Sequence, residues 1–221
     1  MTFSPQIMEL IRNGIGETLY MVFISAAVSY IIGIPLGIIL VVTDKEGIRP
    51  VPLLQKVLGV AINLLRSIPF LILLIMMMPL TRKLVGTSLG WRAVVPPLVA
   101  AAAPYIARMV ESSFKEVDAG VIEAAKSMGA STFQIIWKVL LPEAKPSLIS
   151  GSIISTVTIL SYTALAATLG GTGLGQVAII YGHQRSQKLV VWVCVFLIVI
   201  IVQVIQIVGT RILRKTDKRA R

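Results

Sequence analysis

Side chains able to do bond-breaking chemistry are few in this sequence and stand apart from one another. His183 is the only histidine, and no Cys, Asp or Glu lies near it to complete a metal site. Hydroxyl groups gather in residues 148–169, but no base accompanies them for nucleophilic catalysis. They are Ser155, Thr156, Thr158, Ser161 and Thr163. We expect most of them to bond to the backbone or to other helices, with Ser161 a candidate for a polar path. The sequence thus predicts no catalytic residue and no metal site.

The chain also lacks the residues needed to draw energy from a nucleotide or an ion gradient. No G-x-x-x-x-G-K-[ST] loop is present, since no glycine is followed by lysine. An ion-driven carrier needs carboxylates inside its membrane segments, but the acidic residues lie outside or at the ends of the apolar segments. They are Glu9, Glu17, Asp44, Glu46, Glu111, Glu116, Asp118, Glu123, Glu143 and Asp217. Energy must therefore come from a partner.

A glycine-rich stretch at residues 170–175 does not match the dinucleotide pattern G-x-G-x-x-G, and it follows an apolar segment instead of a strand. We interpret it as a turn. Its backbone freedom makes Gly171 and Gly173 candidates for a gate or a docking loop, and a plain connection is the alternative.

Composition places the chain in a membrane. It has 221 residues, of which 56% are hydrophobic, and its mean hydropathy is +0.86, well above a soluble domain. Lys and Arg outnumber Asp and Glu by 21 to 10. These cations flank apolar segments without interleaved aromatic residues, which favours membrane topology over nucleic-acid binding. The only cysteine, Cys194, cannot form an internal disulfide.

Five apolar segments predict an all-α polytopic helical bundle with five transmembrane helices and a single domain, residues 1–221. The first segment is too long for a cleaved signal peptide, so we expect it to stay as the first span. The third contains three prolines, which predicts a bent helix packed against protein. The expected spans are residues 18–42, 57–80, 93–110, 148–169 and 189–210.

An odd number of spans puts the two termini on opposite sides, and the distribution of Lys and Arg chooses the orientation. With the N-terminus outside, the inner loops and tail carry Lys45, Arg49, Lys56, Lys115, Lys126, Lys138, Lys145, Arg211, Arg214, Lys215, Lys218, Arg219 and Arg221. The outer side then carries only Arg12, Arg82, Lys83, Arg92, Arg185 and Lys188. The bias predicts an outside N-terminus and a cytoplasmic C-terminus.

Arg66 interrupts the second span. A charge at such depth is costly and turns toward protein or water, so Arg66 and the adjacent Ser67 are candidates for a polar path. Snorkelling of the long side chain toward an interface is the alternative interpretation.

The polar segment between the third and fourth spans, residues 116–146, has the pattern of a docking element. Apolar residues recur at helical spacing on both sides of Gly129, which predicts two short amphipathic helices. Asp118 is placed to cap the first helix, Gly129 to end it in a left-handed conformation, and Ser131 or Thr132 to cap the second. Pro142 is expected to close the unit. A partner's groove could hold such a helix pair, and a helix lying in lipid headgroups is the alternative.

Residues of this segment resemble the EAA loop of binding-protein-dependent ABC importer permeases. The resemblance rests on Glu123, Ala124, Ala125, Gly129 and Pro142, with Val139 where the family usually has Ile. Further segments resemble the methionine-importer branch of that family. These are residues 66–70, 85–87, 103–108 and 170–176.

The resemblance implies a type I ABC importer permease in the bacterial inner membrane that moves D- and L-methionine by alternating access. It implies a second copy of the chain, two cytoplasmic ATPase subunits that bind ATP and Mg, and an extracytoplasmic binding lipoprotein. The residues expected to contact the ATPase are Glu123, Ala124, Ala125, Met128, Gly129 and Pro142. A permease for another amino acid, a gradient-driven carrier and a membrane anchor remain as alternatives.

Overall fold

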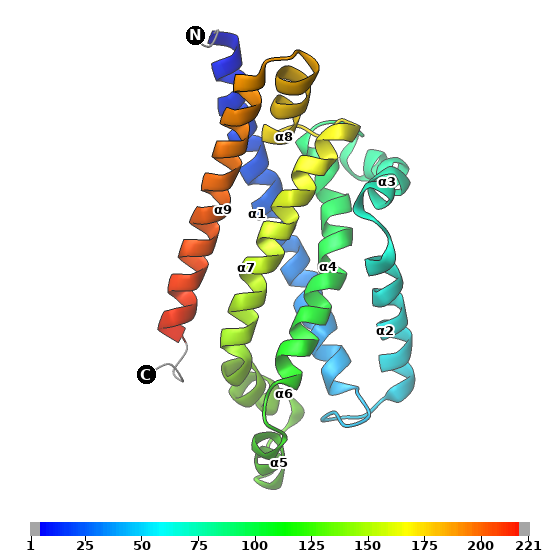
Figure 1. The fold of residues 1–221 in the computed structure, drawn as a ribbon. Coiled ribbons are helices and arrows are strands. Elements are labelled where there is room, and N and C mark those ends of the chain that lie inside the picture. Colours follow the sequence, from blue (N-terminus) through cyan, green and yellow to red (C-terminus); the bar gives the residue numbers. More distant parts are fainter. Residues whose placement is uncertain (1–4, 217–221) are drawn as a thin grey trace.

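The structure, a computed structural model, describes residues 5–216. Lys218, Arg219 and Arg221 of the predicted basic tail, and both ends of the predicted domain, lie outside these residues. Within them the chain is a bundle of upright helices, with short helices at its two ends (Figure 1). The predicted all-α membrane fold is confirmed.

Two long helices, α1 (Pro5–Val42) and α4 (Trp91–Lys115), form the most extensive pair in the bundle. Their close approach depends on glycine. A Cβ on Gly33 would lie 2.9 Å from the carbonyl oxygen of Ala103, and one on Gly37 would lie 2.6 Å from that of Ala107. The three prolines of α4 are accommodated inside a helix that is largely buried by its neighbours.

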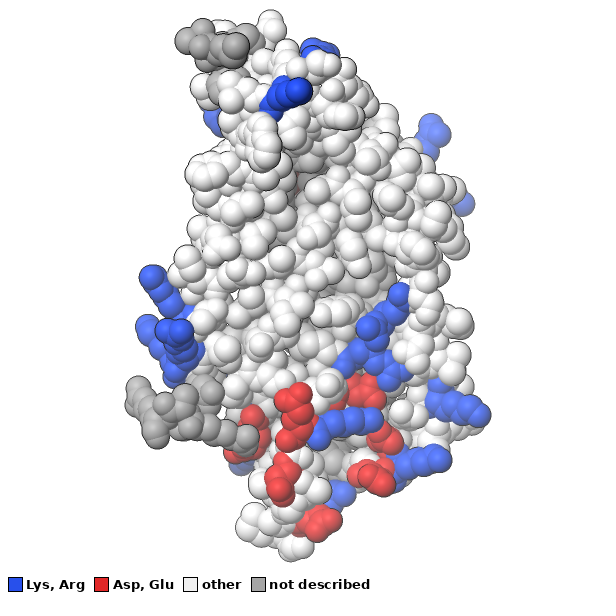
Figure 2. All heavy atoms as spheres, viewed as in Figure 1, with Lys and Arg blue, Asp and Glu red and all other residues white. Residues whose placement is uncertain are grey.

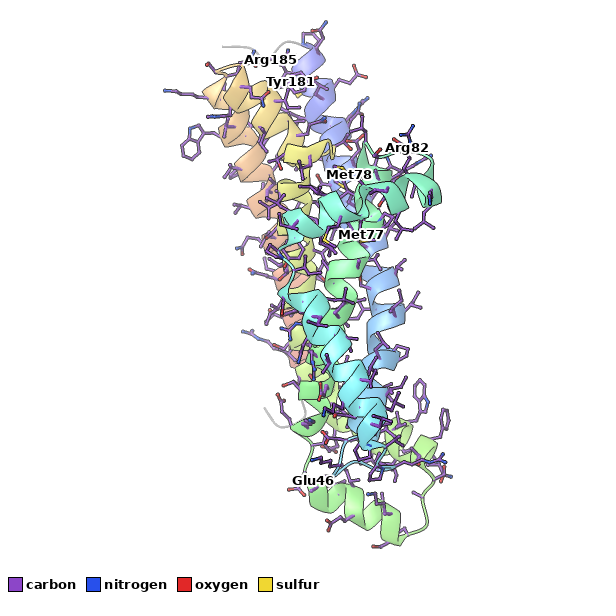
Figure 3. All side chains as sticks on the ribbon, turned by 90° about the vertical axis from the view of Figure 1, so that its right-hand side faces the viewer. Glu46, Met77, Met78, Arg82, Tyr181 and Arg185 are labelled. Carbon is purple, nitrogen blue, oxygen red and sulfur yellow. The ribbon has the colours of Figure 1, made fainter. Side chains whose placement is uncertain are left out.

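The expected second span, residues 57–80, is not one straight helix. It consists of α2 (Pro52–Ser67) and α3 (Phe70–Val85), which meet at 104°. Pro69 lacks a backbone N–H and disfavours helical geometry in the residue before it, and Ile68 accordingly has an extended ψ of 121°. Figure 3 shows α3 turning across the upper part of the bundle with Met77, Met78 and Arg82.

Four other helices among residues 5–216 are long and apolar enough to span a membrane by themselves, and the bent pair makes a fifth span if it counts as one. Besides α1 and α4 they are residues 132–169, which include α7 (Leu141–Ala166), and α9 (Lys188–Thr216). The first turn of α1 and the last turn of α9 lie toward opposite ends of the bundle (Figure 1).

The segment between α7 and α9 consists of short helical turns. These are the 3-10 turn η2 (Ala167–Leu169), α8 (Leu174–Gln176) and the π-helical η3 (Val177–Gln184). His183 is exposed at the end of this segment, as expected of a solvated histidine. The apolar core of this end combines Ile11 of α1 with Leu174, Val177, Val190 and Cys194.

Candidate functional site

The predicted helix pair at residues 116–146 is present and bent where the sequence indicated. The first helix, α5 (Ala119–Ser127), begins at Asp118, whose Oδ1 accepts a hydrogen bond of 2.7 Å from the N–H of Gly120. It ends at Gly129, which has a φ of +76°. The N–H of Ala130 then donates to the carbonyl of Ala125 at 3.1 Å, so a backbone bond closes the helix end.

The second helix, α6 (Thr132–Ile135), begins with a capping box. The Ser131 hydroxyl accepts from the N–H of Gln134 at 3.3 Å, and the Gln134 amide oxygen accepts from the N–H of Ser131 at 2.8 Å. The prediction that Pro142 closes the unit is wrong. Helix α6 continues through the π-helical η1 (Ile136–Leu140) into α7, with Pro142 in its first turn. Because proline has no N–H to donate, the wider π turn before it accommodates the missing hydrogen bond.

Large apolar side chains point outward from this bent pair. The exposed fractions are 81% for Met128, 68% for Phe133 and 55% for Trp137. Glu123, Ala124 and Lys126 are also exposed. Such a cluster at the end of the bundle is typical of a surface that another protein covers.

The other face of the pair packs against the bundle. Ala125, Ile135 and Leu140 are buried and belong to the same core cluster as the centre of α4. The predicted apolar face of α5 is therefore divided, because Ala125 points inward while Val121 and Met128 point outward. The bent pair is thus held rigidly by one face and leaves the other free for a partner.

A chain of charged groups connects the C-terminal end of α4 to its neighbours. Lys115 Nζ lies 2.6 Å from Asp44 Oδ2 and 3.0 Å from Glu111 Oε1. Glu111 Oε2 lies 2.6 Å from Arg108 Nη1, and Arg108 Nη2 donates to the carbonyl of Gly59 in α2 at 2.8 Å. These contacts fix α2 and the loop after α1 to α4, a few residues before α5.

The sequence-based boundary of the third span concealed this role of Glu111. The expected span stopped at Val110, whereas α4 continues to Lys115 and buries Glu111 to 5% exposure. Glu111 lies four residues before Lys115, the last residue of α4, so it stands near the end of this span, as the sequence indicated. Its two cationic partners make Glu111 a structural anchor. Its burial is therefore no argument for an ion-driven carrier. The i, i+3 and i, i+4 spacing of Arg108, Glu111 and Lys115 was the signal available in the sequence.

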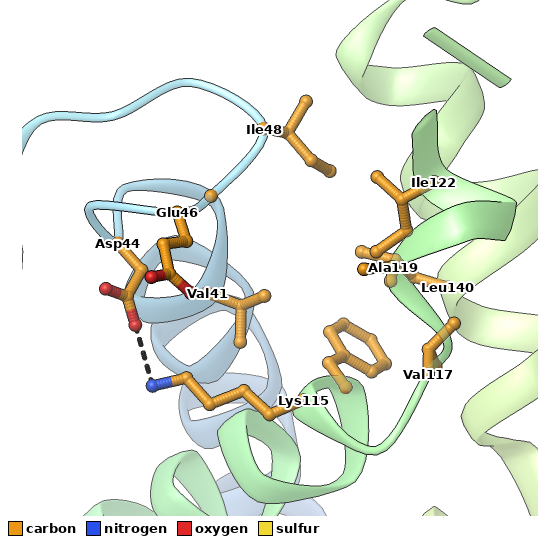
Figure 4. Close-up of a pocket in the computed structure, with 11 residues that line it drawn as sticks. Val41, Asp44, Glu46, Ile48, Lys115, Val117, Ala119, Ile122 and Leu140 are labelled. Carbon is orange, nitrogen blue, oxygen red and sulfur yellow. Dashed lines mark ion pairs between the residues drawn. The ribbon is translucent and has the colours of Figure 1, made fainter. Parts of the chain in front are cut away.

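A cavity of about 310 Å³ lies between the loop after α1 and α5 (Figure 4). Val41, Phe114 and Ile122 supply apolar walls, and Asp44 and Lys115 form their ion pair at its edge. The hydrogen bond from Lys115 holds the pKa of Asp44 below its ordinary value. The loop also reaches α5 directly, since Lys126 Nζ lies 3.5 Å from the carbonyl of Gly47.

The distribution of charge distinguishes the two ends. In Figure 2 the acidic side chains on the visible face gather at the lower end, among Lys and Arg side chains, and none is visible at the upper end. Glu46 lies at this lower end beside α5 (Figure 3).

The candidate path residues fall into two separate groups. Arg66 and Ser67 are exposed at the end of α2, and Arg66 borders a cavity of about 160 Å³ that also involves Tyr162. Ser161 is the exposed neighbour of Tyr162 in α7, and its hydroxyl donates to the carbonyl of Val157 at 3.1 Å. Ser161 thus directly precedes a residue that lines the cavity, but does not line it itself.

Gly171 and Gly173 lie elsewhere, buried against other helices. The N–H of Gly173 donates to Glu17 Oε2 at 3.0 Å, and that of Leu174 donates to Thr18 Oγ1 at 2.9 Å. A Cβ on Gly171 would lie 2.8 Å from the carbonyl oxygen of Ala166. The stretch interpreted as a turn is therefore anchored on α1, which its glycine content alone did not reveal.

Together these features, a helical membrane bundle with an exposed apolar helix pair fixed to one end, are those expected of a transport subunit that works with a separate partner. Residues 33–221 match the family described as binding-protein-dependent transport system inner membrane component, and the chain belongs to this family.

Relatives named as methionine permeases match almost the whole chain. It is 45% identical over 211 residues to the probable D-methionine transport system permease protein MetI of Vibrio cholerae, covering 96% of this chain and 94% of that protein. It is 45% identical over 207 residues to the methionine import system permease protein MetP of Bacillus subtilis, with 94% and 93% covered.

Solved structures agree with the fold. A chain of the MetNI methionine ABC transporter in an inward-facing conformation superposes with a TM-score of 0.95 at 42% identity, over 98% of this chain and all of that one. A chain of an amino acid ABC transporter with histidines gives a TM-score of 0.79 at 17% identity, over 97% and 100%, and shares the fold. The chain is thus a permease subunit, and hydrolysis of ATP is the task of a separate subunit.

Proposed function

We propose that this chain is the translocation subunit of an ATP-driven importer of D- and L-methionine in the bacterial inner membrane. Two copies would pair with two cytoplasmic ATPase subunits, which bind ATP and Mg, and with an extracytoplasmic binding protein. The observation that carries the proposal is the outward cluster of Met128, Phe133 and Trp137 on a helix pair that is fixed to the bundle by its other face. The naming of the MetI and MetP relatives supports the substrate.

In this proposal Glu123, Ala124, Met128 and Gly129 form the contact with the ATPase, while buried Ala125 transmits the force to the core. Pro142, exposed in the first turn of α7, supports the change from the π turn to the regular helix. When the ATPases close, the bent pair moves as a unit. The charged contacts among Asp44, Lys115, Glu111 and Arg108 carry that motion to α2. The bundle thereby alternates between inward and outward access.

We propose further that the docking end faces the cytoplasm and the start of α1 faces outward. The excess of Lys and Arg on the side of the docking element supports this orientation. Arg66, Ser67 and Ser161 would then border the path of the solute, and the anchored Gly171 and Gly173 would shape its outer end.

The test is ATP hydrolysis by the chain assembled in lipid with its cognate ATPase, in the presence of binding protein loaded with methionine or with another amino acid. We expect stimulation only with the methionine-loaded protein. Stimulation by a different amino acid would keep the mechanism and replace the substrate. Failure of the chain to copurify with any ATPase would contradict the docking argument.

A further inference from the structure

Arg66 lies at a depth in the membrane where an uncompensated charge is costly. It lies fourteen positions after Pro52, the first residue of α2 at the docking end of the bundle. At ~1.5 Å per residue this is about 21 Å along an upright helix. A hydrocarbon core of ~30 Å places that level inside the membrane.

The groups around Arg66 compensate its charge only in part. Arg66 lies in the last turn of α2, which ends at Ser67, and a cation near a helix C-terminus is stabilised by the partial negative charge there. The Cζ of Arg66 lies 5.8 Å from the ring centroid of Tyr105, a cation–π arrangement. Over residues 5–216, none of the ion pairs of the chain includes Arg66.

The bend after α2 creates the space in front of this guanidinium. The cavity of about 160 Å³ takes its walls from α2, α3, α4 and α7. Phe70 and Tyr162 stack with their ring centroids 4.5 Å apart and their planes within 5°. The lining therefore combines one cation with three aromatic rings and the aliphatic Leu65, Ile68 and Ala101, and it contains no carboxylate.

We propose that Arg66 binds the α-carboxylate of the transported amino acid as it passes the bend, while the rings of Phe70, Tyr105 and Tyr162 receive an apolar or thioether side chain. A guanidinium presents paired N–H donors that match a carboxylate. Thioether sulfur makes favourable contacts with aromatic rings. The inference rests on the proposed function, because it requires an amino acid to cross this bundle.

The partial compensation of Arg66 suits a site that a solute visits only briefly. A permanent counter-ion would compete with the solute, whereas a bare guanidinium would bind it too tightly to release. The neutral ring of Tyr105 and the helix end hold the charge between these limits.

The test compares Arg66→Gln with Arg92→Gln in proteoliposomes that contain the full complex. Arg92 is a matched control, because its Cζ lies 5.2 Å from the ring centroid of Trp91 but at the first turn of α4, outside the cavity. We expect Arg66→Gln to lower uptake of labelled methionine about ten- to hundredfold, with stimulation of ATP hydrolysis by loaded binding protein retained. Arg92→Gln should keep both, and Arg66→Lys should restore part of the uptake.

The possible results separate this inference from the proposed function. If the wild-type complex shows neither methionine uptake nor stimulated hydrolysis, the proposed function fails. If it transports methionine and Arg66→Gln transports it equally well for each ATP hydrolysed, the carboxylate site is overturned. Loss of assembly with both Gln and Lys at position 66 would also overturn it, because a structural role would then explain the residue.

Discussion

Single residues set the geometry of the docking end. Gly129 has a φ of +76°, a region that favours glycine, yet a Cβ there would meet no atom within 4 Å. Glycine is therefore favoured at this position by its backbone conformation and not by crowding within the chain. Contact with a partner could add a further steric limit. Lys115 instead acts through its side chain, since it bridges Asp44 and Glu111.

We expect Gly129→Asp to uncouple transport from ATP hydrolysis, because the substitution strains a left-handed bend and adds a charge to an apolar contact surface. Gly129→Asn is the matched control, since asparagine has the same shape without the charge and tolerates the left-handed region. The measurement is methionine uptake per ATP hydrolysed, which should fall about tenfold or more for Asp and less for Asn. Wild-type uptake by a well-inserted Asp variant would rule out this account.

The ion pair of Asp44 should give the protein a distinctive stability at low pH. The pKa of Asp44 is lowered from 3.8 by the hydrogen bond from Lys115, so the stabilisation is present above that value and is lost as the pH falls through the folded pKa. Thermal melting of the wild type and Asp44→Asn should differ at pH ~5 to 7, and the difference should shrink only as the pH falls below 3.8. A difference that grew on acidification would contradict the assignment.

At the scale of elements, tertiary packing determined how the helices continue or bend, which local sequence preferences did not reveal. Local signals located α5, its Asp118 cap and the bend at Gly129, because capping depends on residues within one turn. They did not show that α6 runs through a π turn into α7, since that depends on how buried Leu140 and Ala144 meet the core. Nor did hydropathy separate α2 from α3, because the apolar residues of 57–80 continue across the bend.

The α1–α4 contact should be sensitive to any side chain at its glycines. We expect Gly37→Val to lower the stability of the folded chain by about 1–3 kcal/mol or more, because its Cβ would lie 2.6 Å from the carbonyl oxygen of Ala107. Gly16→Ala is the control on the same helix, where no atom lies within 4 Å. Thermal melting in detergent should show a lower midpoint for Gly37→Val than for the wild type. The midpoint of Gly16→Ala should not fall. Equal midpoints for the two variants would contradict this packing.

At the scale of the whole molecule, much of the apolar surface is exposed in a single chain. Leu53, Val57 and Leu64 of α2 and Phe196 of α9 are among the exposed side chains. Lipid or a second copy of the chain must cover them, because contact of such surface with water is costly. On the face shown in Figure 2, the acidic side chains lie toward the lower end, whereas Lys and Arg side chains lie at both ends and part-way along the sides.

Labelling of single cysteines tests the proposed orientation. In a Cys194→Ser background, Ser127→Cys at the end of α5 and Gln184→Cys at the end of η3 are both exposed positions. A membrane-impermeant thiol reagent should label Gln184→Cys in intact cells and Ser127→Cys only after the membrane is opened. The opposite pattern would reverse the orientation.

The sequence by itself determined that the chain is an all-α membrane bundle and located the bent helix pair at residues 116–146. Apolar length, helical periodicity and caps are local properties, so they can be read without knowing the neighbours. Only the tertiary structure decided that Glu111 is buried between two cations, that the glycines of residues 170–175 are anchored on α1, and that Arg66 faces an aromatic cavity. These features depend on residues far apart in the chain, and only packing brings them into contact.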